Sequence, residues 1–182
     1  INLSGFAGTA QGTAADGVFA QTTTGNVVAD NFTAPQGGTG PAIGAAVAGL
    51  SLRAGTGDVS AQNFASSTSG GQYGIFTQTT TSGSINLSGF AGTAQGTAAD
   101  GIFAQTLAGN IIADNFTAPQ GGTGPAVSGG VNGLFLRTET GDVSLQAFAS
   151  SASGGQYGIF AQTVTSGGIN LSGFSGTAQG TG

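Results

Sequence analysis

The carboxylates are the residues of this chain with the most versatile chemistry. They are Asp16, Asp30, Asp58, Asp100, Asp114, Glu139 and Asp142. Carboxylates can form a general acid–base pair or bind calcium. Most of these lie beside Gly or Asn at predicted turns, where an Asp side chain accepts hydrogen bonds from backbone amides. Equivalent carboxylates recur only once per long repeat, so the spacing favours turn capping over a calcium site or a catalytic pair.

The other side chains that catalysis commonly uses are missing from the sequence. The chain has no His and no Cys, and its two basic residues are Arg53 and Arg137. No base is therefore present to activate a Ser nucleophile, and a Gly-rich phosphate loop would lack its Lys. We expect no catalytic, metal or cofactor site, and we do not expect an enzyme.

Charge and hydropathy exclude two further classes of partner. The net charge is −5, whereas nucleic-acid binding depends on clustered Lys and Arg, so no nucleic-acid partner is expected. No apolar run approaches the roughly 18 residues of a membrane-spanning helix, so no membrane insertion of this segment is expected. With no Cys, a disulfide scaffold is also excluded.

The elements that position these residues are set by a long internal repeat. Residues 1–84 recur with few changes as residues 85–168, and a third copy begins over residues 169–182. A repeat of this length is typical of a chain built by stacking structural units. We expect residues 1–182 to form one continuous segment of a longer array, with no separate domains.

A shorter cycle lies within each repeat and predicts the fold. An apolar–x–apolar–x–x–Phe pattern begins at residues 1, 27 and 59 and again at 85, 111, 143 and 169, so a coil averages about 28 residues. A second run of β-branched and aromatic residues follows a Gly in each coil, as at Gly17, Gly49 and Gly74. The sequence therefore predicts an all-β fold. We expect a parallel β-helix, or β-solenoid, with three coils per 84-residue repeat. A Pro- and Gly-rich stretch at 35–41, repeated at 119–125, is the expected loop that lengthens one coil.

Period-two alternation along the second run predicts which side chains face outward. Gln or Arg occupies one position in every coil, and such groups are rarely buried without a partner. If that position faces solvent, the Phe two residues earlier does so as well. These positions form a candidate stripe for lateral interaction. We call it the Phe stripe, and the name covers both the Phe rings and the Gln or Arg residues beside them. Its residues are Phe19, Gln21, Phe76, Gln78, Phe103, Gln105, Phe135, Arg137, Phe160 and Gln162.

The opposite assignment remains open for these rings, because a bulge or corner would turn them inward as ordinary core. Ser51 is a gap in the stripe. A second set of Phe residues ends the apolar–x–apolar–x–x–Phe pattern and is expected to lie in the core after a corner. Asn or Gly precedes most of them, and both tolerate the left-handed backbone that a corner needs.

The repeat resembles the coils of large bacterial surface proteins. The run Tyr157-Gly158-Ile159-Phe160-Ala161-Gln162-Thr163 is similar to the first half of the repeats of autotransporter passengers and filamentous-haemagglutinin-like adhesins. Gly57-Asp58-Val59 and Gly141-Asp142-Val143 fit the second half of that repeat. The resemblance implies a right-handed β-helix that is secreted and displayed on the bacterial cell surface. The near-identity of successive repeats departs from most passengers and favours a stalk or filament body.

These observations together predict a structural protein, the repetitive shaft of an extracellular filament or adhesin stalk. Its expected partners are other copies or neighbouring repeats of the same chain. The alternative is an adhesin module that binds a host or surface glycan through the exposed Phe/Gln ladder.

Overall fold

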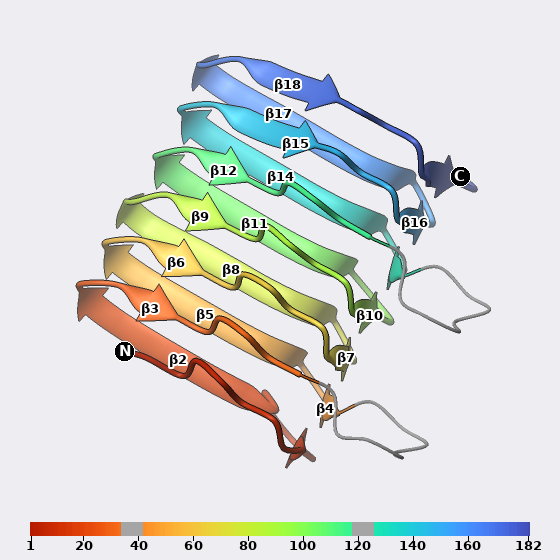
Figure 1. Cartoon of the computed structure of the whole chain (residues 1–182). Helices are drawn as coiled ribbons and strands as arrows, with labels where there is room; N and C mark the ends of the chain where they lie inside the picture. Colours follow the sequence, from red (N-terminus) through yellow and green to blue (C-terminus); the bar gives the residue numbers. More distant parts are fainter. Residues whose placement is uncertain (34–41, 118–125) are drawn as a thin grey trace.

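The computed structural model describes residues 1–33, 42–117 and 126–182, and within them every regular element is a β-strand. The Pro- and Gly-rich loops predicted at 35–41 and 119–125 lie outside the described residues. The strands form three parallel sheets that run the length of the stack (Figure 1). The all-β, parallel part of the predicted fold is confirmed.

Each coil contributes one strand to each sheet, so strands that are neighbours in a sheet are three apart in the chain. The first sheet has the order β1 (Ala10–Gly12), β4 (Ile43–Ala45), β7 (Ser67–Gly70), β10 (Thr93–Gly96), β13 (Val127–Gly129), β16 (Ser151–Gly154) and β19 (Thr177–Gly180). The second has the order β2 (Val18–Thr24), β5 (Ala48–Thr56), β8 (Tyr73–Ser82), β11 (Asp100–Ala108), β14 (Asn132–Thr140) and β17 (Tyr157–Ser166). The third has the order β3 (Val27–Val28), β6 (Val59–Ser60), β9 (Ile85–Asn86), β12 (Ile111–Ile112), β15 (Val143–Gln146) and β18 (Ile169–Ser172).

Equivalent residues of successive coils stack directly on one another. Ile85 pairs with Val59 on one side and with Ile111 on the other, all in parallel register. Because the apolar positions repeat from coil to coil, this register places like side chains in continuous columns. A slip by one residue would move every apolar side chain to the opposite face, so the repeat itself specifies the register.

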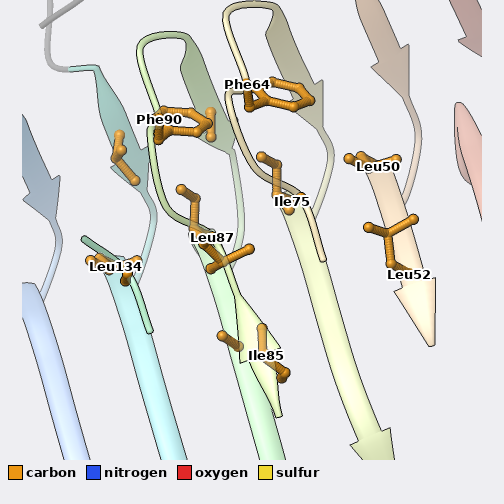
Figure 2. Packing of buried hydrophobic residues seen from close by; sticks show 14 of the residues in the cluster. Leu50, Leu52, Phe64, Ile75, Ile85, Leu87, Phe90 and Leu134 are labelled. Atoms are coloured by element: carbon orange, nitrogen blue, oxygen red, sulfur yellow. The ribbon is translucent and has the colours of Figure 1, made fainter. Parts of the chain in front are cut away.

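The core lies between the three sheets and consists of these apolar columns. Ile85 and Leu87 are buried from the third-sheet side, and Ile75, Ile102 and Leu134 are buried from the second sheet. Figure 2 shows the rings of Phe64 and Phe90 next to one another, on neighbouring coils, at one end of this interior. Their centroids are 5.5 Å apart and their planes differ by 4°. The predicted core position is confirmed for the corner residues Phe32, Phe64, Phe90, Phe116 and Phe148. In the two end coils, Phe6 is only partly buried and Phe174 is 45% exposed.

The first sheet was not predicted from the sequence. Most of its strands read like Thr-Ala-Gln-Gly or Ser-Thr-Ser-Gly, with few of the large β-branched and aromatic residues that mark a strand. The exceptions are β4 and β13, which begin with the buried residues Ile43 and Val127. The small residues suit a sheet whose backbone lies close to its neighbours. A column of Gly at the corner to the second sheet makes this approach possible, as shown by Gly101, where a Cβ would lie 2.7 Å from the carbonyl oxygen of Ser128.

The corner before each core Phe has left-handed backbone, as expected from Asn and Gly. Positive φ occurs at Gly5, Asn31, Asn63, Gly89, Asn115, Ala147 and Gly173. Ala147, with a φ of 51°, is the exception that the sequence reading did not identify. An L-residue with a Cβ pays a steric penalty in this region, whereas Gly does not.

Replacing Ala147 by Gly is therefore expected to raise the free energy of unfolding by about 1 kcal/mol, because relief of the left-handed strain exceeds the entropic cost of Gly. Chemical denaturation of both proteins measures this difference. The matched control is Ala149→Gly, two residues along in the same exposed corner. That change relieves no strain and should cost about 0.5–1 kcal/mol. Equal effects at both positions would contradict the assignment of strain to Ala147.

Candidate interaction face

The outer face of the second sheet carries the residues of the Phe stripe. In β11 the side chains of Ile102 and Ala104 are fully buried in the core, while Phe103 and Gln105 between them are half-buried. The strand alternation therefore turns the Phe and the Gln away from the core. The same alternation holds in β14, where Leu134 and Leu136 are buried.

The outward Phe rings form a stacked column along the rod. Phe76 and Phe103 have centroids 4.9 Å apart, with planes that differ by 5°. The next two steps, from Phe103 to Phe135 and from Phe135 to Phe160, are each 5.0 Å. The spacing follows the separation of parallel strands, so the sheet itself holds the rings in contact. The sequence prediction placed these residues in one column, and the structure brings all of them except Phe19 into direct stacking.

Ser51 interrupts the column between Phe19 and Phe76, and Arg53 fills the gap. The Cζ atom of Arg53 lies 4.5 Å from the ring centroid of Phe76 and 5.9 Å from that of Phe19. A planar guanidinium can take the place of an aromatic ring, because it stacks on aromatic faces and is attracted to their π electrons. The stack thus continues through a cation where the second coil lacks its Phe.

Exposure varies along the column. Phe19 is 52% exposed, Phe103, Phe135 and Phe160 are half-buried, and Phe76 is only 8% exposed. The predicted exposure is therefore wrong for Phe76. Its ring is covered by the guanidinium of Arg53 and by Tyr73, whose ring meets it edge-on at 5.1 Å.

Several apolar side chains of this face were missed by the sequence reading. Tyr157 is 51% exposed at the start of β17, and its ring lies 5.6 Å from that of Phe160. Leu107 and Val164 are 50% and 45% exposed, and they follow the Gln column on the same face of their strands. The signal that could have found Leu107 and Val164 is the period-two alternation itself, continued two residues beyond the Gln.

The Gln/Arg column runs beside the rings and is linked by polar contacts. Gln78 Nε2 donates a hydrogen bond to Gln105 Oε1 at 3.1 Å. In the fifth coil, Arg137 Nη2 donates to Glu139 Oε1 and forms an ion pair with it. Gln21 and Gln162 are the exposed members of the column. The face therefore offers carboxamide donors and acceptors next to a strip of aromatic surface.

All six Asp carboxylates cap the backbone of a later coil. Five of them lie between strands, as predicted, whereas Asp100 is the first residue of β11. The backbone N–H of Ser84 donates to Asp58 Oδ1 at 2.8 Å, and that of Gly168 donates to Asp142 Oδ1 at 2.7 Å. The remaining four act in the same way on Ala48, Gln62, Asn132 and Gln146. These bonds tie each coil to the next outside the sheets. Among the described residues, no three carboxylates are grouped as a metal site would require.

Asp100 differs from the other carboxylates because it is buried. It accepts hydrogen bonds from the Nδ2 group of Asn132 at 2.7 Å and from the Asn132 backbone at 3.1 Å. Burial raises the pKa of the Asp100 carboxyl above its ordinary value of 3.8, and the two hydrogen bonds oppose this rise. Burial, followed by the charge of Asp100, also raises the pKa of the Tyr73 phenol, while Arg53 acts in the opposite direction.

The raised pKa of Asp100 predicts a pH dependence of stability. As the pH rises, Asp100 ionises first in the unfolded chain, so the folded state loses stability across the interval up to its own higher pKa. The melting temperature of Asp100→Asn minus that of the wild type should become more positive as the pH rises from below the ordinary Asp pKa of about 4. Every other ionisable group is common to the two proteins, so the difference isolates Asp100. A difference that is constant, or that falls with pH, contradicts the prediction.

A second concave feature lies on the outer face of the third sheet. A cavity of about 360 Å³ is lined by residues that include Asp58, Ser60, Gln62 and Asn86. A cavity of the same volume recurs 84 residues later, where Asp142, Ser144, Gln146 and Asn170 line it. The third sheet thus carries a periodic polar groove, distinct from the aromatic second sheet. No helix in the described part of the chain is suited to span a membrane.

No protein-family model, curated protein sequence or solved structure matches the chain.

Proposed function

We propose that the chain is the repetitive shaft of an extracellular bacterial β-solenoid filament or adhesin stalk. In this proposal the three parallel sheets form a right-handed β-helix with about 28 residues per coil and three coils per 84-residue repeat. The role is mechanical, because a stiff rod holds the parts attached to its two ends at a fixed distance from each other.

The observation that carries this proposal is the continuity of the stacked columns through every coil. Parallel hydrogen-bonded strands run from β2 to β17 and from β3 to β18 without a break. The corner Phe rings stack at 4.8 to 5.7 Å from Phe6 to Phe174, and the five rings between these two are buried. Asp side chains add a capping bond from coil to coil. Each coil is stabilised by its neighbours, so the structure can be extended by repetition without new interactions.

The outward face supplies a surface for lateral association with other copies. Phe19, Tyr157, Leu107 and Val164 are all 45% exposed or more, and each lies on the second sheet. Exposed apolar groups of this kind on a soluble protein mark an interaction surface. Because the surface repeats along the rod, two rods can meet at many equivalent points, and the weak contacts add up.

Immunogold labelling of intact source cells with antibodies against the purified chain tests the proposal. The expected result is gold along surface fibres or projections without permeabilisation of the cells. Labelling that appears only after the cells are opened contradicts the extracellular assignment. High-resolution reconstruction of the same fibres measures the handedness and the coil size.

The alternative function is glycan binding by the same face, and one observation favours it. Phe19 presents a 52%-exposed ring next to the exposed carboxamide of Gln21. An aromatic ring beside hydrogen-bonding groups is an arrangement suited to a small ligand with both apolar and polar parts.

A glycan array probed with the wild type and with Phe19→Ser tests this alternative. Ser is the residue that the second coil already has at this position, so the fold accommodates it. Glycan binding by the wild type that is lost in the variant, with rods still formed, supports the module. Binding that is equal in both proteins, or absent from both, contradicts it.

A further inference from the structure

The two arginines of the chain occupy equivalent positions in successive repeats but have different surroundings. Arg53 in β5 and Arg137 in β14 are 84 residues apart, and both lie in the Gln/Arg column. Arg137 forms an ion pair with Glu139, two residues later on the same face. The residue equivalent to Glu139 in the first repeat is Gly55. Within the described residues, Arg53 therefore has no carboxylate partner.

The space beside Arg53 in the first repeat is a hollow. In the second repeat, the carboxylate of Glu139 occupies the equivalent position. A cavity of about 170 Å³ is lined by Arg53 and Gly55, together with the polar side chains of Gln21, Thr23, Gln78 and Thr80. A Cβ at Gly55 would collide with the carbonyl oxygen of Thr23, so no side chain can be added at Gly55 without a shift of the main chain.

The polar atoms of Arg53 are also incompletely satisfied. Its Nε is buried, and no hydrogen-bond partner for it exists in the described part of the chain. The guanidinium lies on the ring of Phe76, an interaction that leaves the in-plane N–H groups of its two Nη atoms available to an external acceptor. A guanidinium with free donors is suited to bind a carboxylate through two parallel hydrogen bonds.

From this comparison we propose that the hollow beside Arg53 is a binding site for the carboxylate of a small external ligand. The ligand carboxylate takes the place beside Arg53 that the Glu139 carboxylate has beside Arg137. The carboxamides of Gln21 and Gln78 and the hydroxyls of Thr23 and Thr80 are in position to bind polar groups attached to it. The volume corresponds to about five or six water molecules, which admits the carboxylate end of an acidic sugar or a short organic acid.

The proposed site does not depend on whether the chain is a structural shaft. An acidic sugar and a short organic acid both carry the carboxylate that Arg53 recognises. They differ in the hydroxyl groups that the Gln and Thr side chains can bind. A single partly exposed guanidinium gives weak binding, so the dissociation constant should be in the millimolar range.

Nuclear magnetic resonance can observe the site directly, because the chain has only two arginines and therefore two Nε–Hε resonances. The 15N-labelled protein is titrated with sodium acetate, with sodium glucuronate, and with glucose plus sodium chloride at equal ionic strength. The Arg53 Hε signal should shift and saturate with the two carboxylates but not with glucose and chloride. The Arg137 signal should stay fixed, because the Glu139 carboxylate is already paired with its Nη2 group.

The relative affinity of the two carboxylates identifies the source. Tighter binding of glucuronate assigns the site to acidic sugars, and equal binding assigns it to small carboxylates in general. Either result supports the site. An Arg53 signal that responds no more to carboxylates than to chloride overturns it.

Two variants separate the site from unspecific effects. In the wild type, the carboxylates should also shift the backbone amide signal of Gly55, which lines the hollow. Arg53→Gln introduces the residue found at Gln21 and Gln78, and it should abolish this shift. Glu139→Ala removes the internal carboxylate, and it should make the Arg137 Hε signal responsive to acetate in the same concentration range. An Arg137 signal that stays unresponsive in Glu139→Ala would show that removing the internal carboxylate does not create a binding site, and it would contradict the proposal.

Discussion

Replacing Phe116 by Ala is expected to lower the free energy of unfolding by about 4 kcal/mol, the largest effect of any single change considered. Phe116 is fully buried, and its ring stacks on Phe90 at 5.0 Å and on Phe148 at 5.7 Å. Truncation leaves a cavity in the middle of a rigid column, where the neighbouring rings cannot move along the axis to fill it. Denaturant titration followed by circular dichroism measures the loss.

The matched control for Phe116 is Phe135→Ser on the outer face. Phe135 also stacks between two rings, each at 5.0 Å, but it is half-buried on the solvent side. Ser occurs naturally at the equivalent position of the first repeat, as Ser51. We expect this change to cost about 1 kcal/mol or less, because it forms no enclosed cavity. Similar costs at both positions would contradict the division into a core column and an outer column.

Replacing Gly101 by Ala is expected to cost about 3 kcal/mol, because the added methyl group meets only main-chain atoms. A Cβ there would lie 2.7 Å and 2.8 Å from the carbonyl oxygen and amide nitrogen of Ser128 and 2.8 Å from the carbonyl oxygen of Gly133. Side chains can rotate away from such a contact, but hydrogen-bonded strands cannot. The first and second sheets would have to separate at this corner, and thermal denaturation should show a clear fall in melting temperature.

Gly168→Ala is the control for this second change. The nearest atom to a Cβ at Gly168 is Asp142 Oδ1 at 3.7 Å, an ordinary contact. The equivalent residue of the first repeat is Ser84, so a side chain is tolerated there. We expect the variant to be as stable as the wild type or slightly more so, because Ala loses less conformational entropy than Gly on folding. A large loss in the control would show that Gly→Ala changes are costly irrespective of packing.

The parts of the fold that follow from stacked identical residues could be predicted from the sequence. Ile85 and Leu87, with equivalents in every coil, indicated a parallel sheet and its inward face, and the corner Asn and Gly indicated left-handed backbone. The first sheet could not be predicted in this way. Its strands consist of small and polar residues, and they are held in place by backbone pairing and by the close approach at Gly101. The β-strand propensity of a residue reflects mainly how its side chain packs, so it gives little indication of strands that are made of small residues.

The candidate face was predicted in position but not in detail. Alternation placed Phe103 and Gln105 on one outward face, because that pattern depends only on the strand itself. The covering of Phe76 by Tyr73 and Arg53 depends on contacts between coils, and the second-coil Ser51 determines where the Arg53 guanidinium lies. The ion pair of Arg137 with Glu139, by contrast, lies within β14, and the same alternation places both side chains on one face. The local periodicity of a strand does not predict which side chains from different coils contact one another.

High-resolution cryo-electron microscopy of the protein as isolated from its native surface tests the central claim most directly, by counting the chains in each cross-section. The account predicts several solenoids joined through the Phe stripe, with Phe19, Leu107, Tyr157 and Val164 covered by a neighbouring copy. Single-chain rods whose second-sheet face is bare would contradict a self-associating shaft.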